Sequence, residues 1–159
     1  MAQSSASIAP ITGDLSPEEN KVVYRRYIDE LWNGGKVEVI DEIIHRDCFY
    51  HEPSFQGPTV FDDMTGIIEG FHKAFPDGSF TFTIDEMVAE ADLVFVQLSF
   101  VGVQHGEFCG VKSLGKTLKF KVLGWYRFKE GKIIECRKHN VGDNHDFISA
   151  MGIREQLGA

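Results

Sequence analysis

The spacing of apolar residues divides the chain into a helical half and a strand half. Between residues 16 and 33, apolar side chains recur at helical spacing, as at Val23, Tyr27 and Leu31, which predicts an amphipathic helix. From residue 79 to residue 90, apolar and polar residues alternate instead, and this period of two is typical of a half-buried β-strand. The pattern therefore predicts helices first and strands afterwards.

Capping residues, prolines and glycines set the bounds of three predicted helices. Ser16-Pro17-Glu18-Glu19 combines a capping residue, a proline at the first helical position and two acids at the positive end of the helix dipole. Asn33-Gly34-Gly35 ends this helix. A short second helix is predicted over residues 37–45, a loop over residues 47–58 and a third helix over residues 60–75.

Four strands follow the helices, and Glu130-Gly131 forms the turn between the last two. Residues 147–157 are predicted to add a short closing helix. The strands are predicted over residues 79–90, 92–104, 117–128 and 132–141. Helices followed by strands indicate an α+β domain, in which a curved antiparallel sheet is wrapped over three N-terminal helices.

The run from Asp92 to Gln104 is apolar on both parities. Val94 and Val96 represent one parity, and Phe95 and Val101 represent the other. A strand that is apolar on both faces must be covered on both. The helices can cover one face, so a second subunit is expected on the other, in a homodimer or homotetramer.

Length, composition and charge exclude several classes of protein. The 159 residues suit one domain, predicted over residues 15–159, after a flexible polar arm over residues 1–14. The formal net charge of -8 argues against a nucleic-acid or anionic-membrane partner. No signal peptide and no membrane span are predicted. The odd count of 3 cysteines indicates reduced thiols, and thus a cytoplasmic protein.

Ionisable residues gather on and after the last predicted strand. His139 shares strand parity with Arg137 and, if the strand continues, with Asp143. In a cavity, burial would raise the pKa of Asp143 until it exchanges protons near neutral pH, and Arg137 could stabilise an enolate oxygen. Alternatively, these groups form a solvated edge, and Asp143 only caps the closing helix.

Large apolar side chains provide candidate walls for such a pocket, although each could equally be ordinary core. The candidates are Trp32, Phe55, Phe75, Met87 and Trp125.

A metal site and a nucleotide site are not predicted. His139, Asp143 and His145 could be drawn as two histidines and a carboxylate, but no helical His-x-x-x-His spacing supports them. The chain has no phosphate-binding loop and no dinucleotide fingerprint. Nothing marks any cysteine as an activated nucleophile.

A series of short segments in a specific order resembles one family. These are residues 24–27, 31–35, 50–53, 75–77, 102–108, 126–127 and 131–135. Over about Leu15 to Gly152 the chain resembles the SnoaL-like polyketide cyclase family, which has the nuclear-transport-factor-2-like fold. The resemblance implies a cone-shaped fold with an internal pocket and a cofactor-free enzyme. In such enzymes an Asp or His acts as acid and base on a carbonyl compound.

The resemblance also implies roles for individual residues. Asp143 falls at the family's acid/base aspartate, and His51 at its pocket histidine; His139 could share the proton with Asp143. Gln104 stands where the family often has histidine, so it could hold a substrate carbonyl, while Arg137 replaces the usual aromatic residue.

The combined hypothesis is a cyclase or isomerase that acts on a hydrophobic polyketide- or terpenoid-like carbonyl compound in secondary metabolism. Two alternatives remain open. One is a hydrolase that opens an epoxide or lactone with the same aspartate. The other is a non-catalytic dimeric module that binds a small apolar ligand.

Overall fold

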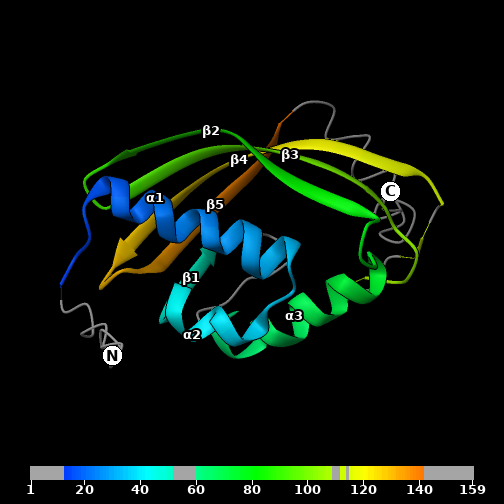
Figure 1. Cartoon of the computed structure of the whole chain (residues 1–159), viewed down its shortest axis with the longest axis horizontal. Helices are drawn as coiled ribbons and strands as arrows, with labels where there is room; N and C mark the ends of the chain where they lie inside the picture. The colour runs from blue at the N-terminus through cyan, green and yellow to red at the C-terminus, as the bar shows by residue number, and fades with distance from the viewer. Residues whose placement is uncertain (1–12, 52–59, 109–111, 114, 142–159) are drawn as a thin grey trace, which may run out of the picture.

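The computed structural model describes residues 13–51, 60–108, 112–113 and 115–141. Its helical segments are α1 (Pro17–Arg26), the π-helical η1 (Tyr27–Asn33), the 3-10 turn η2 (Val37–Val39), α2 (Ile40–Ile43) and α3 (Val60–Ala74). Its strands are β1 (Ile44–His51), β2 (Phe80–Glu90), β3 (Leu93–Val103), β4 (Thr117–Lys129) and β5 (Lys132–Val141). The helices lie together beneath a curved sheet (Figure 1).

The first helix begins and continues as its sequence predicts. The Ser16 hydroxyl accepts a hydrogen bond from the Glu19 N–H at 3.2 Å, and the Glu19 carboxylate accepts one from the Ser16 N–H at 2.8 Å. This reciprocal capping satisfies two amide groups that the helix itself leaves without partners. The same backbone hydrogen bond lowers the pKa of Glu19. α1 then runs without a break into η1, which ends at Asn33.

The sheet has the order β1-β5-β4-β3-β2. The strands β2 to β5 pair antiparallel as predicted, but β1 pairs parallel to β5, so the sheet is mixed. The prediction of a helix end and a loop over residues 44–51 is therefore wrong. This strand carries an exposed charged stretch between its buried positions, and its partner lies more than 80 residues away along the chain, so local pattern gave little signal.

The remaining predicted elements in the described residues are confirmed. The third helix and the four later strands match within one or two residues. The β4–β5 turn has positive φ at both Glu130 (53°) and Gly131 (73°), as a tight type I′ hairpin turn requires. The predicted closing helix, and residues 1–12 of the predicted arm, lie outside the described residues.

The core lies between the helices and the concave face of the sheet. On β3, the even-numbered residues Val94, Val96 and Leu98 are buried toward the helices. The odd-numbered Phe95 and Val101 lie on the opposite face, which we call the outer face, and are 38% and 46% exposed. The two-sided apolar pattern of β3 is thus confirmed, with the helices covering one side of it.

Candidate functional site

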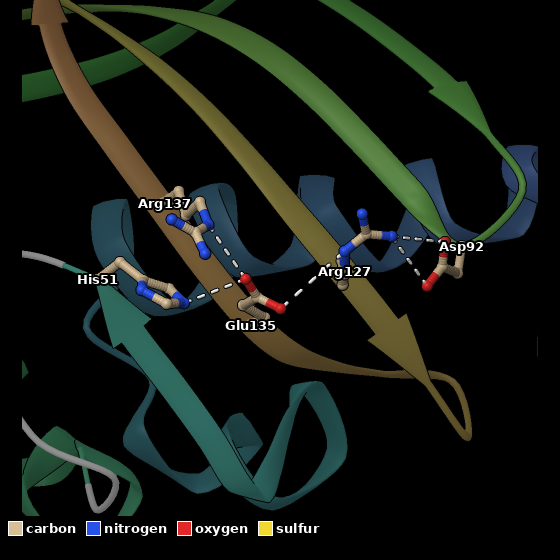
Figure 2. Close-up of polar contacts among 5 residues, drawn as sticks. All are labelled: His51, Asp92, Arg127, Glu135 and Arg137. Carbon is tan, nitrogen blue, oxygen red and sulfur yellow. Dashed lines mark hydrogen bonds and ion pairs between the residues drawn. The ribbon is translucent and has the colours of Figure 1, made fainter.

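The outer face carries a network of charged side chains (Figure 2). His51 Nε2 and Arg137 Nε lie 3.0 and 3.1 Å from the same Glu135 carboxylate oxygen. On the neighbouring strand β4, Arg127 donates to Asp92, in the turn before β3, at 3.1 Å. The helices lie behind the sheet in this view, so the network faces away from the core.

His139 belongs to the same face. Its ring stacks on Trp125, with the centroids 5.3 Å apart. The Arg137 guanidinium lies 6.0 Å from the centre of the Trp125 ring, and the Trp125 ring stacks on Phe95 at 6.5 Å. These contacts follow from the sheet register, which places Arg137 beside Trp125 and Trp125 beside Phe95.

The shared strand parity of Arg137 and His139 is confirmed by the sheet register. The structure places Arg137, His139, His51 and Trp125, all candidates for the pocket, on the outer face and not on the concave side. The residues between them on β5 turn toward the helices: Cys136 is 1% exposed, and Lys138 contacts aromatic rings of η1 and β1.

A small cavity lies on the concave side of the sheet, between η1 and strands β2 to β5. Its volume is about 50 Å³. Aromatic and aliphatic side chains make up most of its walls, and none of its described lining residues is acidic. The lining residues are Tyr27, Ile28, Trp32, Phe82, Leu98, Val122, Tyr126 and Lys138.

Lys138 is the one charged group among these described lining residues. Its ammonium nitrogen lies 5.1 Å from the centre of the Trp32 ring and 5.6 Å from the centre of the Tyr50 ring. A cation over aromatic faces is attracted by their quadrupoles. The arrangement places a positive charge against otherwise apolar walls.

Two tyrosines next to Lys138 are joined by a hydrogen bond. The hydroxyl oxygens of Tyr27 and Tyr50 lie 2.9 Å apart in the core. Burial raises the pKa of Tyr27 to about 12, although the charge of Lys138 opposes this. Burial also raises the pKa of Tyr50 well above its usual range. Both phenols are therefore neutral at physiological pH and serve as hydrogen-bonding groups.

The other predicted site residues occupy varied places. Gln104 is 3% exposed and donates to the Gly106 carbonyl at 2.8 Å, just beyond the end of β3. Phe75 is buried in a second core cluster near the end of α3, and Met87 packs at the margin of the main core. Asp143 and Phe55 lie outside the described residues. Of the described candidates, Trp32 alone lines the cavity.

Seven of the eight described lining residues were not predicted, among them Lys138, Tyr27 and Tyr126. Strand parity offered a signal for Lys138, because it lies two residues from Cys136, an apolar residue expected to face the core. Tyr27 was placed on the apolar stripe of the first helix, and Tyr126 on an apolar strand. Neither was assigned to the pocket.

A broader hollow of about 710 Å³ lies near α2 and the β4–β5 turn. Charged side chains surround it and pair with one another: His45 Nε2 lies 3.4 Å from a Glu130 carboxylate oxygen, and Arg46 lies 3.7 Å from Asp41. Within the described residues, no group of three or more His, Cys, Asp or Glu side chains could hold a metal ion.

The buried thiols are not placed for chemistry. Cys48 and Cys136 are both buried. Burial raises the pKa of Cys48 far above its ordinary value, so the thiol is protonated at neutral pH and is a poor nucleophile.

A helix-covered concave sheet with an aromatic cavity defines a small α+β protein of the kind that encloses small molecules. The chain matches the SnoaL-like polyketide cyclase family over residues 21–144. It therefore belongs to that family. None of the described helices is long and apolar enough to cross a membrane.

Solved structures show the same fold. TsrD from Streptomyces laurentii is 16% identical with a TM-score of 0.73, and covers 87% of this chain and 98% of its own. A protein from Jannaschia sp. CCS1 assigned as a SnoaL-like polyketide cyclase is 23% identical with a TM-score of 0.70, covering 87% and 96%. AclR from Streptomyces galilaeus, assigned as a hydroxylase, is 23% identical with a TM-score of 0.68, covering 87% and 98%. No curated protein sequence matches the chain.

Proposed function

We propose that this protein is a cofactor-free cyclase or isomerase, which acts by acid/base catalysis on a hydrophobic carbonyl compound of the polyketide or terpenoid type. Family membership supports a cyclase-type activity. The observation that carries the proposal is the cavity under the concave sheet, whose largely aromatic and aliphatic walls suit an apolar substrate. A polyketide- or terpenoid-like substrate is larger than the 50 Å³ that the described residues enclose, so part of it would extend beyond this cavity.

Asp143 is the proposed acid/base. The position of His51 and His139 on the outer face takes both histidines away from the cavity. Asp143 lies outside the described residues, and its proposed role rests on its correspondence to the acid/base aspartate of the SnoaL-like family, whose model matches residues 21–144. A carboxylate can remove an acidified C–H proton next to the substrate carbonyl, and the enolate that forms then attacks or rearranges within the bound molecule.

Exchange of carbon-bound hydrogen tests the acid/base role without knowledge of the natural substrate. In D₂O, the enzyme is expected to accelerate deuterium incorporation next to the carbonyl of 1-tetralone, followed by NMR. Asp143→Asn should lower this rate by roughly 10²–10⁴-fold, the range for losing a general base. Asp146→Asn, a second aspartate in the same segment, is the matched control and should keep the rate.

Two outcomes would overturn the assignment. Full exchange activity in Asp143→Asn would remove the aspartate from the mechanism. Binding of carbonyl compounds with no exchange and no conversion by the wild type would instead favour a non-catalytic ligand-binding module. With a converted substrate in hand, incorporation of ¹⁸O from heavy-oxygen water would identify ring hydrolysis in place of ring closure.

Association of two copies through the outer face is part of the proposal. Apolar side chains are exposed there, with Val88 62%, Phe95 38% and Val101 46% accessible. Ion pairs flank them, including Lys121 with Asp85 and Arg127 with Asp92. An apolar centre with a charged rim is the usual anatomy of a protein interface.

A further inference from the structure

The strongest feature that the proposed function leaves unexplained is the ammonium group of Lys138. We propose that Lys138 binds an anionic oxygen of the substrate, so that the substrate class is a hydrophobic compound carrying a carboxylate, enolate or phenolate. This inference rests on the proposed function for the identity of the pocket, and it adds the charge of the molecule that the pocket accepts.

The backbone around Lys138 directs its side chain into the cavity. Lys138 lies opposite Gly124 in the β4–β5 pairing. A side chain at Gly124 would lie 2.9 Å from the Tyr126 ring and 3.2 Å from the Arg137 carbonyl oxygen, so the glycine allows these groups to approach. Lys138 lies two residues from Cys136 on β5, and Cys136 pairs with Tyr126. Because residues two apart share a face of a strand, the stem of Lys138 lies on the concave face with these two buried residues.

The aromatic contacts of Lys138 place its charge at the cavity wall. The ammonium lies over Trp32 from η1 and over Tyr50 from β1. A purely structural role, in which the cation joins these two elements, would also explain the contacts. Lys138 also lines the cavity, so its charge is within reach of a bound molecule.

The donors of the Lys138 ammonium favour an oxygen acceptor as the ligand. An ammonium has three N–H donors, so it can bind a ligand oxygen in addition to any protein acceptor. The cavity of about 50 Å³ suits a small polar head group, with the apolar body of the ligand extending outward.

A local positive charge is needed because the whole molecule disfavours anions. The net charge is -8, which repels negative ligands at long range, although salt screens this repulsion beyond about 8 Å at physiological ionic strength. Inside an apolar cavity the attraction to one ammonium is stronger than in water. Removal of the Lys138 charge should therefore weaken anion binding more than it weakens binding of a neutral ligand of the same shape.

The fluorescence of Trp32 provides a binding assay that needs no turnover. The chain has 2 tryptophans, and Trp125 lies on the outer face, so Trp125→Phe leaves Trp32 as the reporter at the cavity. The probes are cyclohexanecarboxylate and its neutral methyl ester, which do not absorb at the excitation wavelength. In a buffer of about 0.15 M salt, the carboxylate is expected to change Trp32 emission. The change should saturate as the carboxylate concentration rises.

Charge replacement at Lys138 then tests the proposal. In the Trp125→Phe background, Lys138→Met should weaken carboxylate binding by about tenfold or more, and should leave ester binding within threefold. Lys138→Arg keeps the charge and should retain preference for the carboxylate. Circular dichroism and thermal unfolding of each variant establish that the fold is kept.

Two results would overturn the anion site. One is equal carboxylate binding by Lys138→Met and by the parent. The other is no carboxylate binding to the parent protein at all. Because the assay measures binding alone, either result is separate from a failure of the acid/base role, which the deuterium exchange of Asp143→Asn reports.

Discussion

The hydrogen bond between Tyr27 and Tyr50 joins η1 to β1 inside the core. Replacing either tyrosine by phenylalanine leaves the other hydroxyl buried without this partner, and such a loss costs about 1–3 kcal/mol of unfolding free energy. The double variant Tyr27→Phe/Tyr50→Phe removes both polar groups and should cost less than the two single changes added together. Urea unfolding of the four proteins measures this coupling. Strictly additive costs would show that the two hydroxyls do not stabilise each other.

Individual residues of the candidate site were only partly predictable from the sequence. Alternation along β5 correctly grouped Arg137 with His139, since strand geometry fixes which side chains share a face. It could not say which face was the inner one, because both parities contain charged residues. The choice depends on the pairing with β4, which places Trp125 beside Arg137 and Tyr126 beside Cys136. That register joins distant parts of the chain.

At the scale of elements, Asn33 connects the end of η1 to the edge strand β2. Its side-chain amide donates to the Phe82 carbonyl and accepts from the Phe82 N–H, both at 2.9 Å. Asn33→Ala should lower the unfolding free energy by about 1–3 kcal/mol, since two hydrogen bonds are lost, and should speed hydrogen exchange at the Phe82 amide. Asp29→Ala, at an exposed position of the same segment, is the control and should change neither quantity measurably. Unchanged Phe82 exchange in Asn33→Ala would contradict this role.

The elements that could be predicted are those with strong local signals. α1 has a capping motif at Ser16, and β4–β5 has its turn at Glu130-Gly131, so their bounds follow from nearby residues. β1 has neither, because its residues 44–51 mix buried and charged positions in an irregular order. It becomes a strand by pairing with β5. Asn33 shows the same limit: the sequence identifies it as a helix end, but its bonds to β2 require the tertiary fold.

At the scale of the whole molecule, the outer face is the surface that the helices leave open. The sequence anticipated this from the two apolar parities of β3, and the structure places Phe95 and Trp125 near the middle of that face, stacked on each other. The His51–Glu135–Arg137 network (Figure 2) lies on the same face, with the Arg137 guanidinium 6.0 Å from the centre of the Trp125 ring. The ionisable groups that first suggested a catalytic pocket therefore lie at the proposed contact between copies.

A charge introduced into that apolar centre should separate the copies. Phe95→Asp replaces a large apolar side chain, whose full burial contributes about 1.5–3 kcal/mol, with a carboxylate. Each substituted subunit in the dimer should raise the dimer Kd by at least about tenfold. Sedimentation equilibrium should show the wild type near twice the 17.9 kDa chain mass, or four times if a second interface forms a tetramer, and Phe95→Asp in a smaller state. Val22→Asp is the matched control, because Val22 is 60% exposed on α1, away from the outer face, and should leave assembly unchanged. A wild type that stays at the chain mass at micromolar concentration, or a Phe95→Asp protein that assembles like the wild type, would show that the outer face does not join copies.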